Sequence, residues 1–395
     1  MPTARGWAAI GAGIGLAAAW WGFGERSLLA AAAFVLLAVA VGVVYVRRID
    51  PTLSLTRHIV PAAIHDGDRA VVALTLRSER RVYHAALVEE VATLGSARFT
   101  TDRIDPNVPT VARYEVRCRP RGVYRVGPAR ITTRDPLGLA ERSRSVGAPD
   151  RLVVYPRVDP LEGLPLGRGQ DPTTQAAKVS FSQTSGEDFY TLREYRHGDD
   201  LRRVHWPSSA KRDELMIRQL EIPWTSRALV LLDPRNDRYR GPDAFEQAVR
   251  GAASVLRHLY RSGYSPRLWT GPGAVGAPIS TATAYDLAME ELATVRTLGG
   301  LDLAAAVGRL RRTGMAGGIL VVVTGTPDET VGALHRSLGE AFHRSIVLVV
   351  DDGNLEGPAR LARGGALVVR AAPGDAWTVP WRTTMESAWS TATAG

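Results

Sequence analysis

The sequence predicts an α/β protein with an N-terminal transmembrane helical hairpin, a small antiparallel β-sandwich and a C-terminal doubly wound α/β domain. Two uncharged apolar runs occupy residues 7–24 and 27–46. Apolar and polar residues then alternate with period two from Leu53 to about Val146, and after residue 225 continuous Val/Ile/Leu runs alternate with amphipathic helical patterns. The predicted divisions are 1–48 for the hairpin, 49–150 for the sandwich, 151–224 for a linker and 225–395 for the α/β domain.

Each of the two apolar runs is about as long as one membrane-spanning helix. Trp20 and Trp21 end the first run and Tyr45 ends the second, as expected of aromatic side chains at a membrane interface. A cleaved signal peptide is the alternative for the first run. However, a small-x-small cleavage site is not evident, and a second, stronger apolar run follows at once. A helical hairpin is therefore the preferred interpretation.

The orientation of this hairpin follows from its flanking charges. Arg5 precedes the first run, Arg47 and Arg48 follow the second, and the turn between the runs carries Glu25 and Arg26, with no net charge. The positive-inside rule then places both ends of the hairpin in the cytoplasm. The predicted location is the cell membrane, with two spans and the bulk of the chain cytoplasmic.

The middle segment has the pattern of short antiparallel strands. The runs "AVVALTLRS" (70–78), "RYEVRCR" (113–119), "GVYRVG" (122–127) and "ARITTRD" (129–135) alternate between apolar and polar residues and are broken by Gly, Pro and Asp. Cys118 shares a face with Tyr114 and Val116, which predicts a buried thiol. It is the only cysteine of the chain, so an intrachain disulfide is excluded.

The composition of the chain bears on its class of partner. At 395 residues, with 45% hydrophobic and 23% charged residues, it has the composition of a globular protein, and its formal net charge is +9. Seven arginines and one acid lie between Arg113 and Arg134, without a zinc finger or an RNA-binding signature. Nucleic-acid binding is therefore not expected. The arginines indicate either a solvated face or a basic surface near anionic lipid head groups.

The C-terminal segment has the pattern of a parallel sheet covered by helices on both faces. Strand runs at 228–233, 267–271, 318–325, 345–352 and 366–372 alternate with helical patterns. Asp233, Thr324 and Asp351 end three of these strands, at the sheet edge where such domains bind ligands. No phosphate-binding loop of the GxxxxGK[ST] type occurs, so nucleotide binding is not indicated.

The most distinctive stretch of the chain is "LREYRHGDDLRRVHWPSSAKRDELMIRQLE" (192–221), which lies just before the first strand of the α/β domain. Together with the apolar hairpin and "RGVYRVGPARITTRDPLGL" in the β segment, it resembles the bacterial membrane-anchored proteins of the "domain of unknown function 58" family. The matching signature positions are Leu192, Arg193, Glu194, Tyr195, Gly198, Asp199, Asp200, Arg202, Trp206, Ser209 and Ala210.

This resemblance implies a von Willebrand factor A-like C-terminal domain and a non-enzymatic role. It also implies an AAA+ ATPase of the MoxR type as a partner. A metal-competent domain of this kind carries D-x-S-x-S after its first strand. Here that stretch reads Asp233-Pro234-Arg235-Asn236-Asp237, and the arginine would compete with a cation. Asp233 and Asp237 are candidate ligands of a degenerate magnesium site, and no cofactor is otherwise expected.

Three interpretations of the signature run remain open. His197 and His205 with Asp199 and Asp200 could form an acid–base or metal set, as in a membrane-bound hydrolase, although no nucleophile is placed beside them. The charged residues could instead pair with one another as a polar joint, or Arg, Tyr and Trp could form a docking surface. The predicted function is a membrane-anchored adaptor, and the alternatives are a metal-dependent ligand-binding module or, third, a hydrolase.

Overall fold

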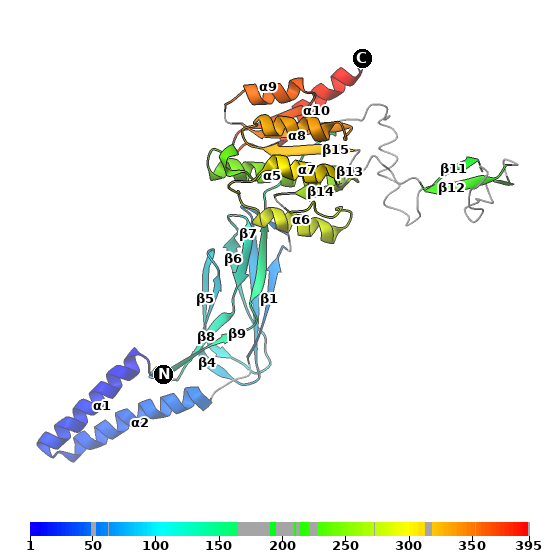
Figure 1. The fold of residues 1–395 in the computed structure, drawn as a ribbon. Coiled ribbons are helices and arrows are strands. Elements are labelled where there is room, and N and C mark those ends of the chain that lie inside the picture. Colours follow the sequence, from blue (N-terminus) through cyan, green and yellow to red (C-terminus); the bar gives the residue numbers. More distant parts are fainter. Residues whose placement is uncertain are drawn as a thin grey trace. The chain divides into compact units, whose positions relative to one another are not determined.

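The computed structural model describes residues 1–48, 53–61, 63–164, 190–194, 209–210, 214–220, 227–271, 273–312, 318–351 and 353–393. The chain divides into two units, Met1–Tyr155 and Pro156–Gly395 (Figure 1). The first unit holds the predicted hairpin and the β segment. The second holds a parallel sheet with its helices and a separate two-stranded sheet.

The N-terminal hairpin consists of α1 (Ala4–Phe23) and α2 (Arg26–Arg48), both long and apolar enough to cross a membrane. Thr3 caps α1, because its side-chain oxygen accepts a hydrogen bond from the backbone N–H of Gly6 at 3.1 Å. Gly24 ends α1 in the left-handed conformation (φ 71°), which permits the tight turn into α2. The two predicted apolar runs therefore form two helices.

Two sheets pack face to face in the remainder of the first unit. One sheet has the order β1 (Leu53–Val60), β3 (Arg69–Ser78) and β6 (Thr110–Arg117), and all its pairs are antiparallel. The other has the order β2 (Ile64–His65), β10 (Asp150–Tyr155), β7 (Gly122–Val126), β4 (Val82–Val91), β8 (Ala129–Arg134) and β9 (Glu141–Val146), with β5 (Gly95–Ile104) paired to β4.

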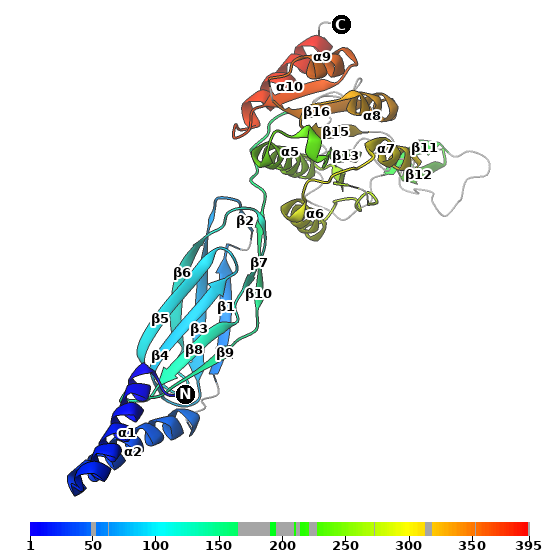
Figure 2. The same ribbon diagram turned by 60° about the vertical axis from the view of Figure 1, so that its left-hand side comes forward.

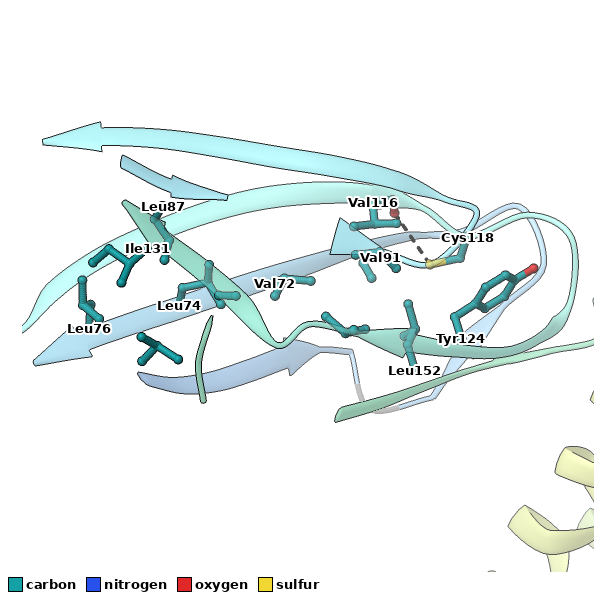
Figure 3. Close-up of a cluster of buried hydrophobic side chains, with 14 of the residues drawn as sticks. Val72, Leu74, Leu76, Leu87, Val91, Val116, Cys118, Tyr124, Ile131 and Leu152 are labelled. Atoms are coloured by element: carbon teal, nitrogen blue, oxygen red, sulfur yellow. Dashed lines mark hydrogen bonds between the residues drawn. The ribbon is translucent and has the colours of Figure 1, made fainter. Parts of the chain in front are cut away.

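The core between these sheets is built from the alternating apolar residues that the sequence pattern indicated. Val72 and Leu74 of β3 face Ile131 of β8 and Leu152 of β10 within one buried cluster (Figure 3). Cys118 is fully buried in this cluster, which confirms the prediction of a core thiol. Outward-facing arginines such as Arg113 and Arg130 are exposed, as strand alternation requires.

The second unit contains a five-stranded parallel sheet of order β14-β13-β15-β16-β17. Its strands are β13 (Arg227–Leu232), β14 (Ser265–Trp269), β15 (Ile319–Thr324), β16 (Arg344–Val350) and β17 (Leu367–Ala371). Its helices are α5 (Pro242–Arg261), α6 (Ala282–Thr294), α7 (Leu303–Arg312), α8 (Glu329–Gly339), α9 (Glu356–Arg363) and α10 (Thr378–Thr393).

Helices cover both faces of this sheet, because successive strand residues point to opposite sides. Leu229 and Leu320 belong to a buried cluster with side chains of α7 and α8. On the other face Gly251 of α5 has no Cβ, and a Cβ there would lie 3.1 Å from Leu348 and 3.0 Å from Trp377. Because all neighbouring strands of this sheet are parallel, the carboxyl ends of the five strands lie at the same edge.

Candidate functional site

The carboxyl edge of the parallel sheet carries a buried carboxylate. Asp233 directly follows β13 and is 0% exposed, and Thr324, the last residue of β15, is also fully buried. The Thr324 hydroxyl donates a hydrogen bond to Oδ2 of Asp233 at 3.0 Å. A buried charge of this kind is stable only where a counter-charge and further hydrogen bonds meet it.

Arg235 supplies that counter-charge. Its guanidinium lies between two carboxylates: Nη2 is 2.8 Å from Oδ2 of Asp233, and Nη1 is 2.7 Å from Oδ2 of Asp328. Nε donates a further hydrogen bond to Oδ1 of Asp233 at 3.0 Å. Burial alone would lower the pKa of Arg235, but the hydrogen bonds and charges of the two carboxylates outweigh it and raise that pKa. The guanidinium is therefore held in its charged form.

Asp328 links this ion pair to the start of α8. Its side chain caps the helix, because Oδ1 accepts a hydrogen bond from the backbone N–H of Val331 at 2.9 Å. Burial raises the pKa of Asp328, but the hydrogen bonds from Arg235 and Val331 together with the charges of Arg235 and Arg238 lower it overall. Asp328 is thus a stable anion that ties the loop after β13 to α8.

The loops that follow β13 and β15 are also in direct backbone contact. The Thr326 N–H donates to the carbonyl oxygen of Arg238 at 2.8 Å. A Cβ at Gly325 would lie 2.0 Å from that same oxygen, so only glycine permits this approach. The stretch "VVVTGT" therefore packs its backbone directly against the loop that follows β13. A metal-binding von Willebrand A-like domain would instead have an acidic residue at this point of the sequence.

The other acids of this region are paired with arginines as well. Asp237 forms an ion pair with its neighbour Arg238 at the surface, and Asp351 accepts a hydrogen bond from Nη2 of Arg370 at 2.7 Å. Within the described ranges, no three His, Cys, Asp or Glu side chains converge as a metal-binding group. Since a guanidinium fills the space between Asp233 and Asp328, this arrangement does not fit a magnesium ion, which requires a shell of oxygen ligands.

The signature run is described only in part. Leu192, Arg193 and Glu194 lie in β11 (Tyr190–Glu194), which pairs antiparallel with β12 (Met216–Leu220). These two strands form a sheet of their own, separate from the parallel sheet. Ser209 is buried and Ala210 is exposed. The remaining residues of the run that the sequence analysis singled out lie outside the described residues: Tyr195, His197, Gly198, Asp199, Asp200, Arg202, His205 and Trp206. The three interpretations of the run, as a polar joint, a catalytic or metal set, or a docking surface, therefore stay predictions.

Sequence reasoning identified Asp233 and the competing charge of Arg235, but it missed Asp328. The contact between Arg235 and Asp328 joins residues 93 positions apart, which no local pattern reveals. A weaker signal was present: Asp328 precedes the helical pattern of α8 and is a residue type preferred at a helix N-cap.

Comparison with known proteins gives a family match for part of the chain. The family model described as "Protein of unknown function DUF58" matches residues 191–360, which include most of β11, all of β12 and the parallel sheet through β16. The "Uncharacterized protein YeaD" of Bacillus subtilis (strain 168) is 28% identical over 223 residues, which are 54% of this chain and 54% of that protein. The chain therefore matches this curated relative over about half of the relative's length.

Solved structures share only limited similarity with this chain. The CARDB domain of a Pyrococcus furiosus protein is 14% identical, with 26% of this chain and 88% of that chain covered, at a TM-score of 0.21. A β-glucosidase 3B from Thermotoga neapolitana is 15% identical, with 26% and 17% covered, at a TM-score of 0.16. At these TM-scores the similarity carries no inference about fold or activity.

Proposed function

We propose that this chain is a membrane-anchored adaptor that presents a von Willebrand factor A-like α/β unit to a cytoplasmic protein partner. In this proposal α1 and α2 form the anchor, and the partner is an AAA+ ATPase of the MoxR type in a chaperone-like or envelope-related complex. The adaptor does no chemistry of its own. It holds the ATPase at the membrane surface.

The observation that carries this proposal is the position of the Arg235 guanidinium between Asp233 and Asp328. The carboxyl edge of a parallel sheet is where α/β domains bind cofactors and substrates. Here that edge is closed by an ion pair within the chain and by the contact of Gly325 with Arg238. A domain whose usual ligand-binding edge is filled in this way is better suited to protein recognition through another surface.

The von Willebrand A-like interpretation is supported by the order of the elements. A buried strand ends at an acid, Asp233, and leads through a short 3₁₀ helix (Asn236–Arg238) into the amphipathic α5. The motif positions after Asp233 depart from the metal-binding pattern, so recognition in this proposal is independent of a divalent cation. The match of the DUF58 model to residues 191–360 is compatible with this interpretation.

The signature run is the proposed docking segment. Along the sequence it begins within β11 and extends through β12, and it combines Arg, Tyr and Trp, the residue types that most often anchor protein interfaces. Arg47 and Arg48 at the end of α2 favour a cytoplasmic location for all that follows, by the positive-inside rule. A cytoplasmic ATPase would then meet the run on its own side of the membrane.

Affinity capture with the intact chain tests this proposal. The chain, tagged at its C-terminus, is purified from gently solubilised bacterial membranes, and bound ATPase is identified by mass spectrometry and then by direct binding of the two purified proteins. We expect capture by the wild type and by an Arg69→Ala control at an exposed ion pair, and loss of capture in an Arg202→Ala, Trp206→Ala double variant. Failure of the wild type to retain any AAA+ ATPase would contradict the adaptor function.

A further inference from the structure

The helical hairpin is fixed to one end of the β-sandwich. The Thr3 N–H donates to the carbonyl oxygen of Leu139 at 2.9 Å, and the Thr3 hydroxyl donates to the carbonyl oxygen of Gly138 at 2.7 Å. At the C-terminal end of α2, Nη1 of Arg142 donates a hydrogen bond to the carbonyl oxygen of Arg47 at 3.2 Å. The two helices therefore meet the sandwich at the β8–β9 loop and the start of β9 (Figure 2). This end of the unit faces the membrane if the hairpin spans it.

Strand register shows which other loops lie at this end. Ala85 of β4 pairs with Thr133, near the end of β8, so the start of β4 lies beside the β8–β9 loop. Tyr83 pairs with Arg103, near the end of β5, so the β5–β6 loop lies at the same end. The β3–β4 turn belongs to this end because it leads directly into β4. We call these three loops the hairpin-side loops: residues 79–81, 105–109 and 135–140.

The hairpin-side loops expose apolar side chains together with arginines. Val108 is 55% exposed and Leu137 is 65% exposed, each near the tip of its loop. Arg80 is exposed in the β3–β4 turn, and Arg77 is exposed at the end of β3. Neither arginine has an ion-pair partner among the residues that the structure describes, whereas Arg81, Arg103 and Arg134 at the same end are paired with Asp105 or Glu141.

Exposed apolar side chains beside exposed arginines are typical of a surface that binds a membrane. Apolar side chains gain by entering the boundary between head groups and acyl chains, while arginines gain by approaching lipid phosphates. Within a soluble assembly the same loops would leave Leu137 and Val108 in water. Arg47 and Arg48 end α2 on this side and add to the positive charge.

We infer that the hairpin-side loops, with Arg77, Arg80, Val108 and Leu137, form a docking surface for the anionic head groups of the bilayer that α1 and α2 enter. This inference rests on the membrane anchorage in the proposed function. It adds that the sandwich is seated on the lipid surface and that its seating depends on anionic lipid. An anchor alone would hold the sandwich near any bilayer, whatever its charge.

A fluorescent label at Leu137 tests the inference in the full chain. Cys118 is buried, so a cysteine introduced by Leu137→Cys is the accessible thiol for an environment-sensitive dye. Ser96, exposed at the opposite end of β5, gives the matched control through Ser96→Cys. The labelled chains are reconstituted into phosphatidylcholine vesicles with or without phosphatidylglycerol. We expect blue-shifted emission and loss of iodide quenching for the Leu137 label when the anionic lipid is present, and no change for the Ser96 label.

Charge variants identify the residues responsible. An Arg77→Gln, Arg80→Gln double variant should lose the difference between the two vesicle types, while Arg117→Gln, which removes an exposed arginine near the other end of the sandwich, should retain it. Inorganic phosphate added to the chain in neutral detergent should leave the Leu137 label unchanged. A response to phosphate alone, or no response to phosphatidylglycerol, would overturn the inference.

Alkaline carbonate extraction separates this inference from the proposed function. If the reconstituted chain resists extraction but the Leu137 label does not respond to anionic lipid, the membrane anchorage is supported and the inference of a lipid-docking surface is wrong. If carbonate releases the chain, the membrane anchorage itself fails.

Discussion

Arg235 and Asp328 lie 93 residues apart in the sequence, and their side chains are 2.7 Å apart in the structure. The pair joins the loop after β13 to the N-terminus of α8, and the same guanidinium is the counter-charge of Asp233. Because Asp233 is 0% exposed, removal of the arginine leaves a buried carboxylate without a counter-charge.

The first prediction follows from this pair. Arg235→Met should lower the free energy of unfolding of the second unit by about 3–5 kcal/mol, the usual cost of breaking a buried ion pair from one side. For a unit of this size that corresponds to a Tm lower by roughly 10 °C. Thermal unfolding in detergent measures it, with Arg69→Ala as control, because the Arg69–Glu115 pair is exposed. Equal Tm values for Arg235→Met and the wild type would show that the ion pair does not stabilise the unit.

The second prediction concerns divalent cations. Mg²⁺ should not raise the Tm of the wild-type chain, since the Arg235 guanidinium fills the space between Asp233 and Asp328. In an Arg235→Ser variant the two carboxylates and the Thr324 hydroxyl become available, and these are the oxygen ligands that Mg²⁺ and Mn²⁺ prefer. Mg²⁺ or Mn²⁺ should then restore part of the lost Tm, and an additional Asp233→Asn change should abolish the effect. Stabilisation of the wild type by Mg²⁺ would instead favour the metal-dependent ligand-binding function.

The third prediction concerns a polar network inside the β-sandwich. Nε of Arg57 donates to Oε1 of Glu89 at 2.9 Å, and the Tyr114 hydroxyl donates to Oε2 of the same carboxylate at 2.6 Å. The side chains of Arg57 and Glu89 are 2% and 0% exposed. Tyr114→Phe removes one hydrogen bond to a buried charge and should cost about 1.5–3 kcal/mol. Arg57→Met should cost more, about 3–5 kcal/mol, because it leaves Glu89 without its cation.

Chemical denaturation of the first unit measures both changes. The order of the two losses is the informative result, since a larger effect for Tyr114→Phe than for Arg57→Met would mean that the ion pair does not carry the network. Burial, followed by the hydrogen bond and charge of Glu89, also raises the pKa of Tyr114. Its absorbance should therefore show no phenolate at a pH where exposed tyrosines titrate.

The fourth prediction is a pH dependence at His258 of α5. Its Nε2 is 2.9 Å from the carbonyl oxygen of Gly163, and its ring packs edge-on against Trp381 of α10. Burial lowers the pKa of His258 and outweighs the hydrogen bond to Gly163, which raises it. The unfolded chain therefore binds the proton more readily. The stabilising contribution is complete above the unfolded pKa of about 6.5 and is lost as the pH falls through the folded pKa.

Thermal unfolding of the second unit at pH 7.5 and pH 5 checks this dependence. His258→Gln keeps a hydrogen-bond donor near Gly163 but removes the titrating group, so the variant should lose less stability at pH 5 than the wild type. The same loss in both proteins would assign the pH dependence to other groups.

The fifth prediction concerns the joint between α1 and the sandwich. A Cβ at Gly6 would lie 2.0 Å from the carbonyl oxygen of Leu139, whereas a Cβ at Gly11 of the same helix meets nothing within 4 Å. Gly6→Ala should displace α1 from the β8–β9 loop, and Gly11→Ala should not. Hydrogen–deuterium exchange of residues 138–141 measures the difference, with faster exchange expected only in Gly6→Ala. Unchanged exchange in Gly6→Ala would show that the joint tolerates a side chain.

Much of the fold could be predicted because it follows from local periodicity. The alternation in "AVVALTLRS" and the continuous apolar run "GILVVVTG" indicate β3 and β15, and both runs contain nearly the whole of the strand observed. The two apolar runs of the hairpin also match α1 and α2 within a few residues. Such signals are carried by neighbouring residues, so no knowledge of the tertiary structure is required.

The side-chain partners could not be predicted in the same way. Arg57 stands in the inward register of β1, between Leu55 and Ile59, which signals that its charge is buried. Its partner Glu89 lies in another strand and another sheet, so the sequence alone could not name it. For the same reason the stretch "DPLG" does not reveal that it is the attachment point of the hairpin, because its contact with Thr3 joins residues more than a hundred positions apart.

In the proposed arrangement, the length of the sandwich determines how far from the bilayer the first unit ends. β3 contains ten residues and rises by about 3.3 Å per residue, so the sandwich is roughly 30 Å long. The hairpin joins one end, and the first unit ends at Tyr155, which pairs with His65 near the β2–β3 turn at the opposite end. In that arrangement the chain leaves the sandwich at the end remote from α1 and α2, and lengthening or shortening the strands would change the distance between the proposed anchor and this exit point.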